Sequence, residues 1–190
     1  QAKSEVALAE SVPHIEIALD PIGNLKEWRA VDKPFCYRKA EGRRFLSRAD
    51  ELGVPVCSFS TIPKQKSYAQ VCKEARKLGD IQAVVSTGPC DIRSKWGGIF
   101  FYGIHQVDMV LRLLGYDINH VQVAKGKGQN HTAQIAYANG TVATMNLVGG
   151  ASAAFHLSAI GEKGRLDEPI VSDSSSYLTG IRDFCRMFRT

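Results

Sequence analysis

Hydrophobic and polar positions alternate along the chain with two different periods. Residues 40–52 carry apolar side chains at positions 45, 46, 49 and 52, the spacing of one helix face, and Gly53 follows them. Similar patterns predict helices at residues 13–19, at residues 68–78 before Gly79, and in a stretch that ends at Leu114 before Gly115. Short apolar runs between them predict strands at residues 5–9, 28–31, 54–59 and 81–87. This alternation of strand and helix indicates parallel βα units.

The pattern changes after Gly115. Strand-like runs cover residues 121–124, 132–137, 141–148 and 153–160, and a helical pattern covers residues 177–188. Asn139-Gly140 lies between the second and third runs and is a strong hairpin signal. We therefore predict an α/β protein in which the end of a doubly wound parallel sheet precedes an antiparallel or mixed sheet. The two domains are expected at residues 1–60 and 61–190.

Composition excludes several classes of protein. The 190 residues are 44% hydrophobic and 23% charged, as in a globular domain, and no apolar run is long enough to span a membrane. The net charge of +5 is spread over predicted helix faces where acidic residues alternate with basic ones, which does not indicate nucleic-acid binding. The five cysteines form no Cys-x-x-Cys pair, so we expect no metal site, and their odd number favours reduced thiols and a cytoplasmic location.

Two residues stand where they could carry chemistry. Lys33 follows a predicted strand and precedes a proline, and ligands of open α/β sheets bind beyond the carboxyl ends of strands. His105 shares a predicted helix face with Phe101, Asp108 and Arg112, and an imidazole with a pKa of about 6.5 suits proton transfer. The alternatives are a surface lysine in a turn and a structural histidine that is bonded to Asp108 or to the backbone.

Several short motifs follow one another in an order that resembles one family. They are Pro13-His14, Asp32-Lys33-Pro34, Glu51-Leu52-Gly53-Val54-Pro55-Val56, Gly103-Ile104-His105-x-x-Asp108, Ala138-Asn139-Gly140-Thr141-Val142-Ala143 and Gly161-Glu162-Lys163-Gly164. In order and approximate spacing, the set resembles the glucose–fructose oxidoreductase / inositol dehydrogenase family along nearly the entire chain. Asp32-Lys33-Pro34 corresponds to the Glu-Lys-Pro motif of that family.

The resemblance implies a Rossmann domain that binds NAD or NADP, followed by a domain whose open-faced sheet forms a homo-oligomer. It implies hydride transfer between the nicotinamide and a hydroxyl of a sugar or polyol. Lys33 would bind the reacting hydroxyl and His105 would act as its acid/base group, with Phe101 and Asp108 also beside the substrate. The cofactor would contact Pro13, His14, Asp32, Lys33 and Pro34.

The sequence departs from the family at three places. It contains no Gly-x-Gly-x-x-Gly, so it begins near the middle of the family's Rossmann domain and resembles part of a longer protein. Phe101 stands where many members carry an aspartate, and Thr61 and Ile62 stand where an arginine is common. Three alternatives therefore stay open: a catalytically silent nucleotide- or sugar-binding sensor, an oligomerising sheet with a vestigial cleft, and a glycosidase that uses tightly held NAD.

Overall fold

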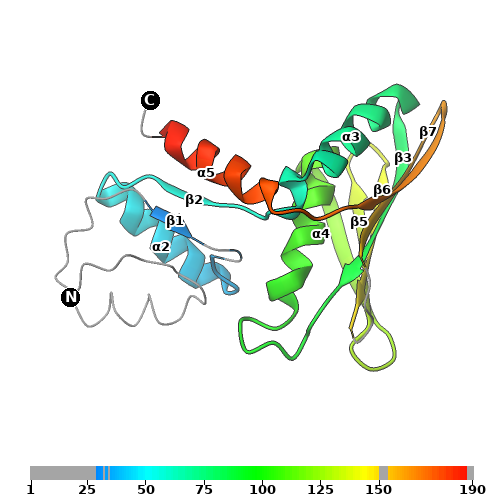
Figure 1. The fold of residues 1–190 in the computed structure, drawn as a ribbon. Coiled ribbons are helices and arrows are strands. Elements are labelled where there is room, and N and C mark those ends of the chain that lie inside the picture. The colour runs from blue at the N-terminus through cyan, green and yellow to red at the C-terminus, as the bar shows by residue number, and fades with distance from the viewer. Residues whose placement is uncertain (1–28, 32, 34, 150–153, 188–190) are drawn as a thin grey trace.

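The computed structural model describes residues 29–31, 33, 35–149 and 154–187, which form two sheets (Figure 1). The predicted strand at 5–9 and helix at 13–19 lie outside these residues. The boundary predicted after residue 60 falls between the two sheets and stays a prediction. Within the described residues, no helix is both long enough and apolar enough to cross a membrane.

The smaller sheet is the parallel βα unit that the sequence predicts. Strand β1 (Arg29–Val31) pairs in parallel with β2 (Val56–Ser58), and helix α2 (Lys39–Glu51) connects them. The strand is shorter than the predicted 54–59 run, while the helix agrees to within one residue at each end. Because the two strands are parallel, their carboxyl ends, and hence Lys33 and Ser60, lie at the same edge of the sheet.

The larger sheet is mixed, as predicted. It has the order β4-β5-β6-β3-β7-β8, in which β3 and β6 are parallel and the other neighbours are antiparallel. The strands are β3 (Ile81–Pro89), β4 (Ile118–Lys125), β5 (His131–Tyr137), β6 (Val142–Val148), β7 (Phe155–Gly161) and β8 (Gly164–Ile170). Strand β3 thus lies inside the sheet, next to partners that come about 60 to 80 residues later in the chain.

The hairpin predicted at Asn139-Gly140 joins β5 to β6. Gly140 has φ +88°, a left-handed conformation that glycine adopts without strain. The Thr141 backbone N–H donates a hydrogen bond of 3.1 Å to Asn139 Oδ1, which fixes the turn. This local chemistry sets the register of the two strands, in which Ala136 faces Val142.

Strand β8 was not predicted from the sequence. Arg165, Asp167, Glu168 and Pro169 give it the composition of a loop. Among the described strands it pairs only with β7 and forms the edge of the sheet. Edge strands tolerate charged residues and proline because one row of backbone groups faces solvent.

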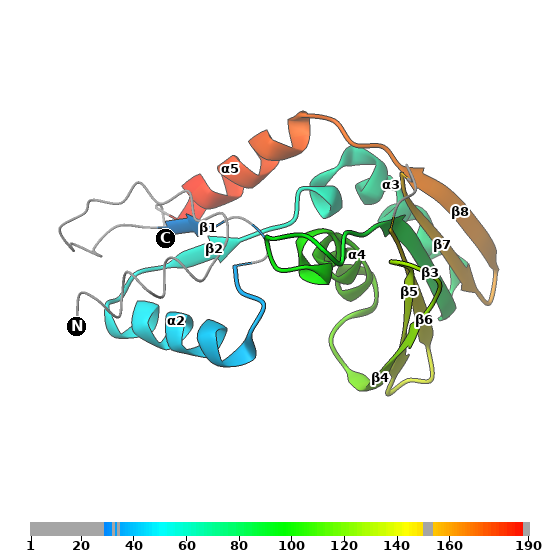
Figure 2. The same cartoon turned by 90° about the horizontal axis from the view of Figure 1, so that it is seen from below.

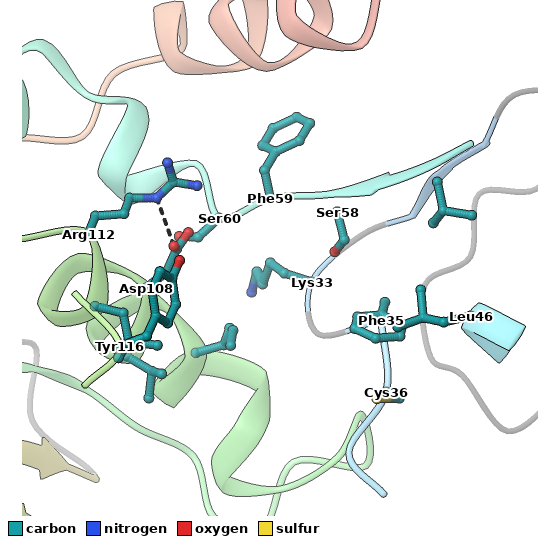
Figure 3. Close-up of a pocket in the computed structure, with 14 residues that line it drawn as sticks. Lys33, Phe35, Cys36, Leu46, Ser58, Phe59, Ser60, Asp108, Arg112 and Tyr116 are labelled. Atoms are coloured by element: carbon teal, nitrogen blue, oxygen red, sulfur yellow. Dashed lines mark hydrogen bonds and ion pairs between the residues drawn. The ribbon is translucent and has the colours of Figure 1, made fainter. Parts of the chain in front are cut away.

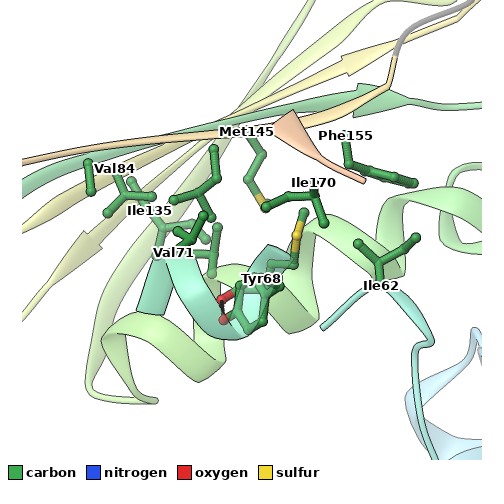
Figure 4. Packing of buried hydrophobic residues seen from close by; sticks show 14 of the residues in the cluster. Ile62, Tyr68, Val71, Val84, Ile135, Met145, Phe155 and Ile170 are labelled. Atoms are coloured by element: carbon green, nitrogen blue, oxygen red, sulfur yellow. Dashed lines mark hydrogen bonds between the residues drawn. The ribbon is translucent and has the colours of Figure 1, made fainter. Parts of the chain in front are cut away.

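Helices α3 (Lys66–Ala75) and α4 (Ile99–Leu114) cover one face of the larger sheet (Figure 2). A 3₁₀ turn, η1 (Ile62–Lys64), precedes α3, and a second, η2 (Arg76–Leu78), continues it to the predicted end at Gly79. The Tyr68 hydroxyl donates a hydrogen bond of 2.6 Å to the Met109 carbonyl oxygen and so ties α3 to α4. Buried side chains from both helices and from five strands form one core (Figure 4).

The opposite face of the larger sheet carries no helix in the described part of the chain. Its side chains are mainly polar, with Gln134, Thr144 and Asn146 among them, but Val85 and Ile160 are also exposed there. The sequence resemblance predicts such an open face.

The last helix, α5 (Ser175–Met187), agrees with the predicted 177–188. It runs from the larger sheet towards the smaller one (Figure 2) and contacts η1, where Lys64 forms an ion pair with Asp183. Its residue Gly180 lies so close to the Phe59 ring that a side chain at this position would collide with it.

Candidate functional site

Helix α4 begins after the loop 90–98 that follows β3, and a glycine makes this start possible. Gly98 caps the helix at φ +60°, and a Cβ at this residue would stand 3.0 Å from the Ile92 carbonyl oxygen. Only glycine fits both constraints without strain. The apolar run that follows places Gly103, Met109 and Val110 against the sheet. The sequence therefore fixes both the start of α4 and the direction in which Phe101 and His105 project.

Lys33 reaches from the end of β1 to the first turn of α4. Its Nζ donates a hydrogen bond of 2.8 Å to the Phe101 carbonyl oxygen and lies 4.4 Å from the centre of the Phe101 ring. Carbonyl groups in the first turn of a helix are normally bonded within the helix, so this lysine adds a charged contact between two distant segments. Lys33 lies at a bend and is half-buried beside α4 (Figure 3).

A pocket of about 440 Å³ opens in front of Lys33. It lies at the carboxyl ends of β1 and β2 and is bounded on the other side by one face of α4 (Figure 3). Ser58 and Ser60 supply polar groups to its wall, while Phe35 and Phe59 supply aromatic ones. Its size and its mixture of apolar walls and a few polar groups are typical of small-molecule sites.

His105 is buried, with 5% of its surface exposed, and it contacts the pocket wall rather than forming part of it. Its Nδ1 lies 2.6 Å from Oγ of Ser60, which lines the pocket and also accepts a hydrogen bond from the Ile62 backbone N–H. Asp108 is not the partner of this histidine. Its carboxylate instead binds Arg112 Nε at 2.7 Å, one turn further along α4 (Figure 3).

Burial, together with the smaller effect of the nearby Lys33 ammonium, lowers the pKa of His105 to about 3. The imidazole is therefore neutral at physiological pH. The rings around it are aromatic: Phe155 and Tyr102 have centroids 5.4 Å and 6.1 Å from the imidazole. Phe101 supplies no carboxylate that could offset the positive charge of Lys33.

The structure brings together the predicted site residues that it describes. Lys33 touches Phe101, while His105 and Asp108 follow one and two turns later on α4. Pro13, His14, Asp32 and Pro34, predicted to contact the cofactor, lie outside the described residues.

Sequence reasoning missed Ser60 and gave no role to Tyr102. Ser60 could have been found from its place just after a predicted strand, on the same edge of the sheet as Lys33. Its hydrogen bond to His105 could not be predicted, because the two residues lie 45 positions apart in the sequence. Tyr102 could have been found from its spacing, because residues three apart on a helix are neighbours and it precedes His105 by three.

Neither a family model nor a curated protein matches the sequence. Solved structures do match the fold. The myo-inositol dehydrogenase from Corynebacterium glutamicum is 15% identical over 84% of this chain and 62% of its own, with a TM-score of 0.69. The chain has the fold of the inositol dehydrogenases. Its fold thus agrees with the resemblance seen in its motifs.

Two further matches extend the likeness. The scyllo-inositol dehydrogenase from Lactobacillus casei is 16% identical over 76% of this chain and 49% of its own, with a TM-score of 0.61. GenD2 from gentamicin A biosynthesis, solved in complex with NAD, is 16% identical over 74% of this chain and 47% of its own, with a TM-score of 0.65. The chain spans less than two thirds of the length of each of these three structures.

Proposed function

We propose that the protein is an NAD(P)-dependent oxidoreductase that transfers a hydride between the nicotinamide and a hydroxyl of a sugar or polyol. The observation that carries this proposal is the convergence of Lys33, Phe101 and His105, from two distant segments, in a fold shared with inositol dehydrogenases. The fold alone does not define a reaction, so the proposal rests on these side chains.

The described residues fit the ring end of the cofactor. The pocket beside Lys33 is large enough for a nicotinamide or for a six-membered polyol, and Phe35 and Phe59 offer flat apolar walls. Lys33 is the described residue that would hold the nicotinamide end and the reacting hydroxyl. When bound, the nicotinamide supplies the hydride acceptor or donor.

Within this proposal, Lys33 binds the oxygen of the reacting hydroxyl. Its ammonium has three hydrogens and the Phe101 carbonyl accepts one, which fixes the direction of the side chain. A positive charge at this place stabilises the negative charge that develops on the oxygen as its proton leaves. His105 is the acid/base residue that the family resemblance implies, and its neutral imidazole with a pKa of about 3 is a weak base.

Cofactor binding tests the proposal directly. We would titrate the full-length protein with NADH and NADPH, following the fluorescence of the reduced nicotinamide, and then screen polyols and sugars for cofactor reduction. Saturable binding of one dinucleotide, with reduction by at least one polyol or sugar, is the expected result. Absence of binding to both dinucleotides would refute the proposal.

A catalytically silent sensor is the second candidate, and Phe101 favours it. With no carboxylate at this position, nothing among the described contacts of His105 raises its pKa. The same titration separates the two candidates, because a sensor would bind the dinucleotide or a sugar without any reduction of the cofactor.

The open face of the larger sheet is the proposed contact between copies of the chain. Val85 and Ile160 are apolar side chains on neighbouring strands of this face, and both are exposed. We expect a molar mass by light scattering of at least twice that of one full-length chain, and a shift towards the monomer in Val85→Glu. A wild-type protein that stays monomeric would contradict this assembly.

A further inference from the structure

Among the described strands, the larger sheet ends in two edges that differ in what protects them. β8 forms one edge; it contacts α3 and carries three charged residues and a proline, namely Arg165, Asp167, Glu168 and Pro169. Charged residues and proline at an edge oppose pairing with a further strand. β4 forms the other edge, at the opposite end of the sheet (Figure 2), with no proline and with Lys125 as its one lysine, arginine or acidic residue. β4 is therefore the unprotected edge.

The side chains of β4 include two exposed valines. Val121 and Val123 lie opposite Ile135 and Ala133 of β5, so they share the face of the sheet that bears the helices. Ile135 and Ala133 are buried in the core, whereas Val121 and Val123 are 53% and 61% exposed, beyond the cover of α3 and α4. The edge thus presents an apolar strip that no described element covers.

The outward backbone groups of β4 belong to the same residues. The Tyr137 N–H donates a hydrogen bond of 2.9 Å to the Thr141 carbonyl oxygen, on the side of β6. Successive residues of an antiparallel strand point their N–H and C=O groups to opposite neighbours, so Ala136 bonds towards β4, where His120 is its partner. Along β4, positions 120, 122 and 124 therefore face β5, and positions 121, 123 and 125 face outward.

We propose that β4 pairs antiparallel with β4 of a second copy of the chain, so that two larger sheets form one continuous sheet. A two-fold axis perpendicular to the sheet relates the copies, which makes the contact self-complementary. With Gln122 at the axis, Val121 lies opposite Val123 of the second copy, and their outward N–H and C=O groups bond to each other. The four valines then cover one another on the face that bears the helices.

Charge favours a second copy as the occupant of this edge. In the proposed register, Lys125 lies opposite Asn119 of the second copy and diagonal to its Asp117, and Asp117 is exposed. A lysine side chain reaches such a diagonal neighbour, and the two-fold axis repeats this contact at the other end of the strand pair. A register shifted by two residues would instead place a valine opposite Asn119 or Lys125.

The surface involved is separate from the candidate site and from the open face, so the inference does not depend on hydride transfer. The experiment measures the molar mass of the full-length protein by light scattering over a range of concentrations. It uses the Val85→Glu background, which removes the proposed contact of the open face and leaves the edge to be measured alone. We expect a reversible dimer, because one strand pair is smaller than a typical stable interface.

A matched pair of valines tests the place of the contact. Val123→Glu, added to this background, should raise the dissociation constant of the dimer by about 10-fold or more, because it brings a charge into both valine pairs. Val171→Glu is the control, because this valine is 62% exposed beside the other edge of the sheet, and it should leave the dimer unchanged.

Two further variants separate pairing from a loss of folding. Val123→Pro removes one outward N–H group and none of the bonds to β5, so the dimer should be lost while circular dichroism and the thermal midpoint stay near those of the background. Lys125→Glu should weaken the dimer by roughly 3- to 10-fold, and adding Asp117→Lys should restore it.

Hydrogen exchange of the full-length wild type gives a readout that needs no substitution. The amides of residues 121, 123 and 125 should be protected, and dilution should reduce their protection as the copies separate.

Three results would overturn the inference, and none of them affects the proposed hydride transfer. A Val85→Glu protein that is folded and monomeric at every concentration would show that the edges do not pair. Dimers of equal strength in Val123→Glu and Val171→Glu would show that the copies meet at another surface. Protection of residues 121, 123 and 125 that persists in a monomer would show that another segment of the full-length chain covers β4.

Discussion

The buried imidazole of His105 makes a quantitative prediction about stability. Its pKa is about 3 in the folded protein and about 6.5 when exposed in the unfolded chain. The unfolded state therefore binds the proton more readily, and acid favours unfolding through this residue. The contribution to stability is fully present above about pH 6.5 and is lost as the pH falls towards 3.

The size of the effect follows from the two pKa values. When the pH falls from about 7.5 to about 5.5, the free energy of unfolding should decrease by about 1.4 kcal/mol because of His105 alone. At about pH 4.5 this decrease should reach about 2.7 kcal/mol. This loss is a large part of a typical domain stability of about 5–15 kcal/mol. It should therefore stand out from the smaller contributions of exposed groups.

Urea unfolding of the full-length wild type and His105→Gln across this pH range measures the effect. The variant keeps an amide that can bond to Ser60 but removes the titration, so its stability should fall less steeply with acid. His120→Gln, at an exposed position on β4, is the control and should behave as the wild type. Parallel pH profiles for wild type and His105→Gln would refute the claim that the imidazole is buried and neutral.

Three other substitutions test the packing around the site. Phe101→Asp should raise the pKa of His105 by roughly 1–3 units, because it places a negative charge near the imidazole. NMR titration of the ring measures this pKa, and an unchanged value would show that the two residues do not interact. Ser60→Ala should cost about 1–3 kcal/mol in urea unfolding because it leaves the buried Nδ1 without its partner, and a cost near zero would contradict that bond. Gly88→Ala places a methyl group 2.4 Å from Phe155 Cδ1 and should lower the free energy of unfolding by about 1–3 kcal/mol. Adding Phe155→Leu should restore part of this loss, and a double variant as unstable as Gly88→Ala would show that the clash with Phe155 is not its cause.

The elements that the sequence predicted well are those with local signals. Residues 40–52 show a helical period, and Asn139-Gly140 specifies its own turn, so both were placed within one or two residues. The charged strand β8 was missed because what makes it a strand is the neighbouring β7, not its own composition. Likewise, no local pattern indicates that β3 lies between β6 and β7.

In the candidate site, too, features with a local sequence signal could be predicted, and those that depend on distant contacts could not. The resemblance and the helix period brought Lys33 and His105 to attention, and their proximity follows from the fold. The partner of His105 could not be predicted, because Asp108 on the same helix face prefers the guanidinium of Arg112 and the serine comes from a distant strand end. The pKa of the histidine depends on burial, which appears only once α4 packs against the sheet and Phe155.

The central claim is that Lys33 binds a hydroxyl group during hydride transfer, and one measurement tests it most directly. It is the rate of NADH or NADPH formation from polyols and sugars by the full-length wild type, by Lys33→Met and by Lys39→Met, an exposed position on α2. We predict turnover by the wild type and Lys39→Met, and a loss of roughly 100-fold or more in Lys33→Met. Equal rates in Lys33→Met and the wild type, or no cofactor reduction by the wild type, would contradict the account.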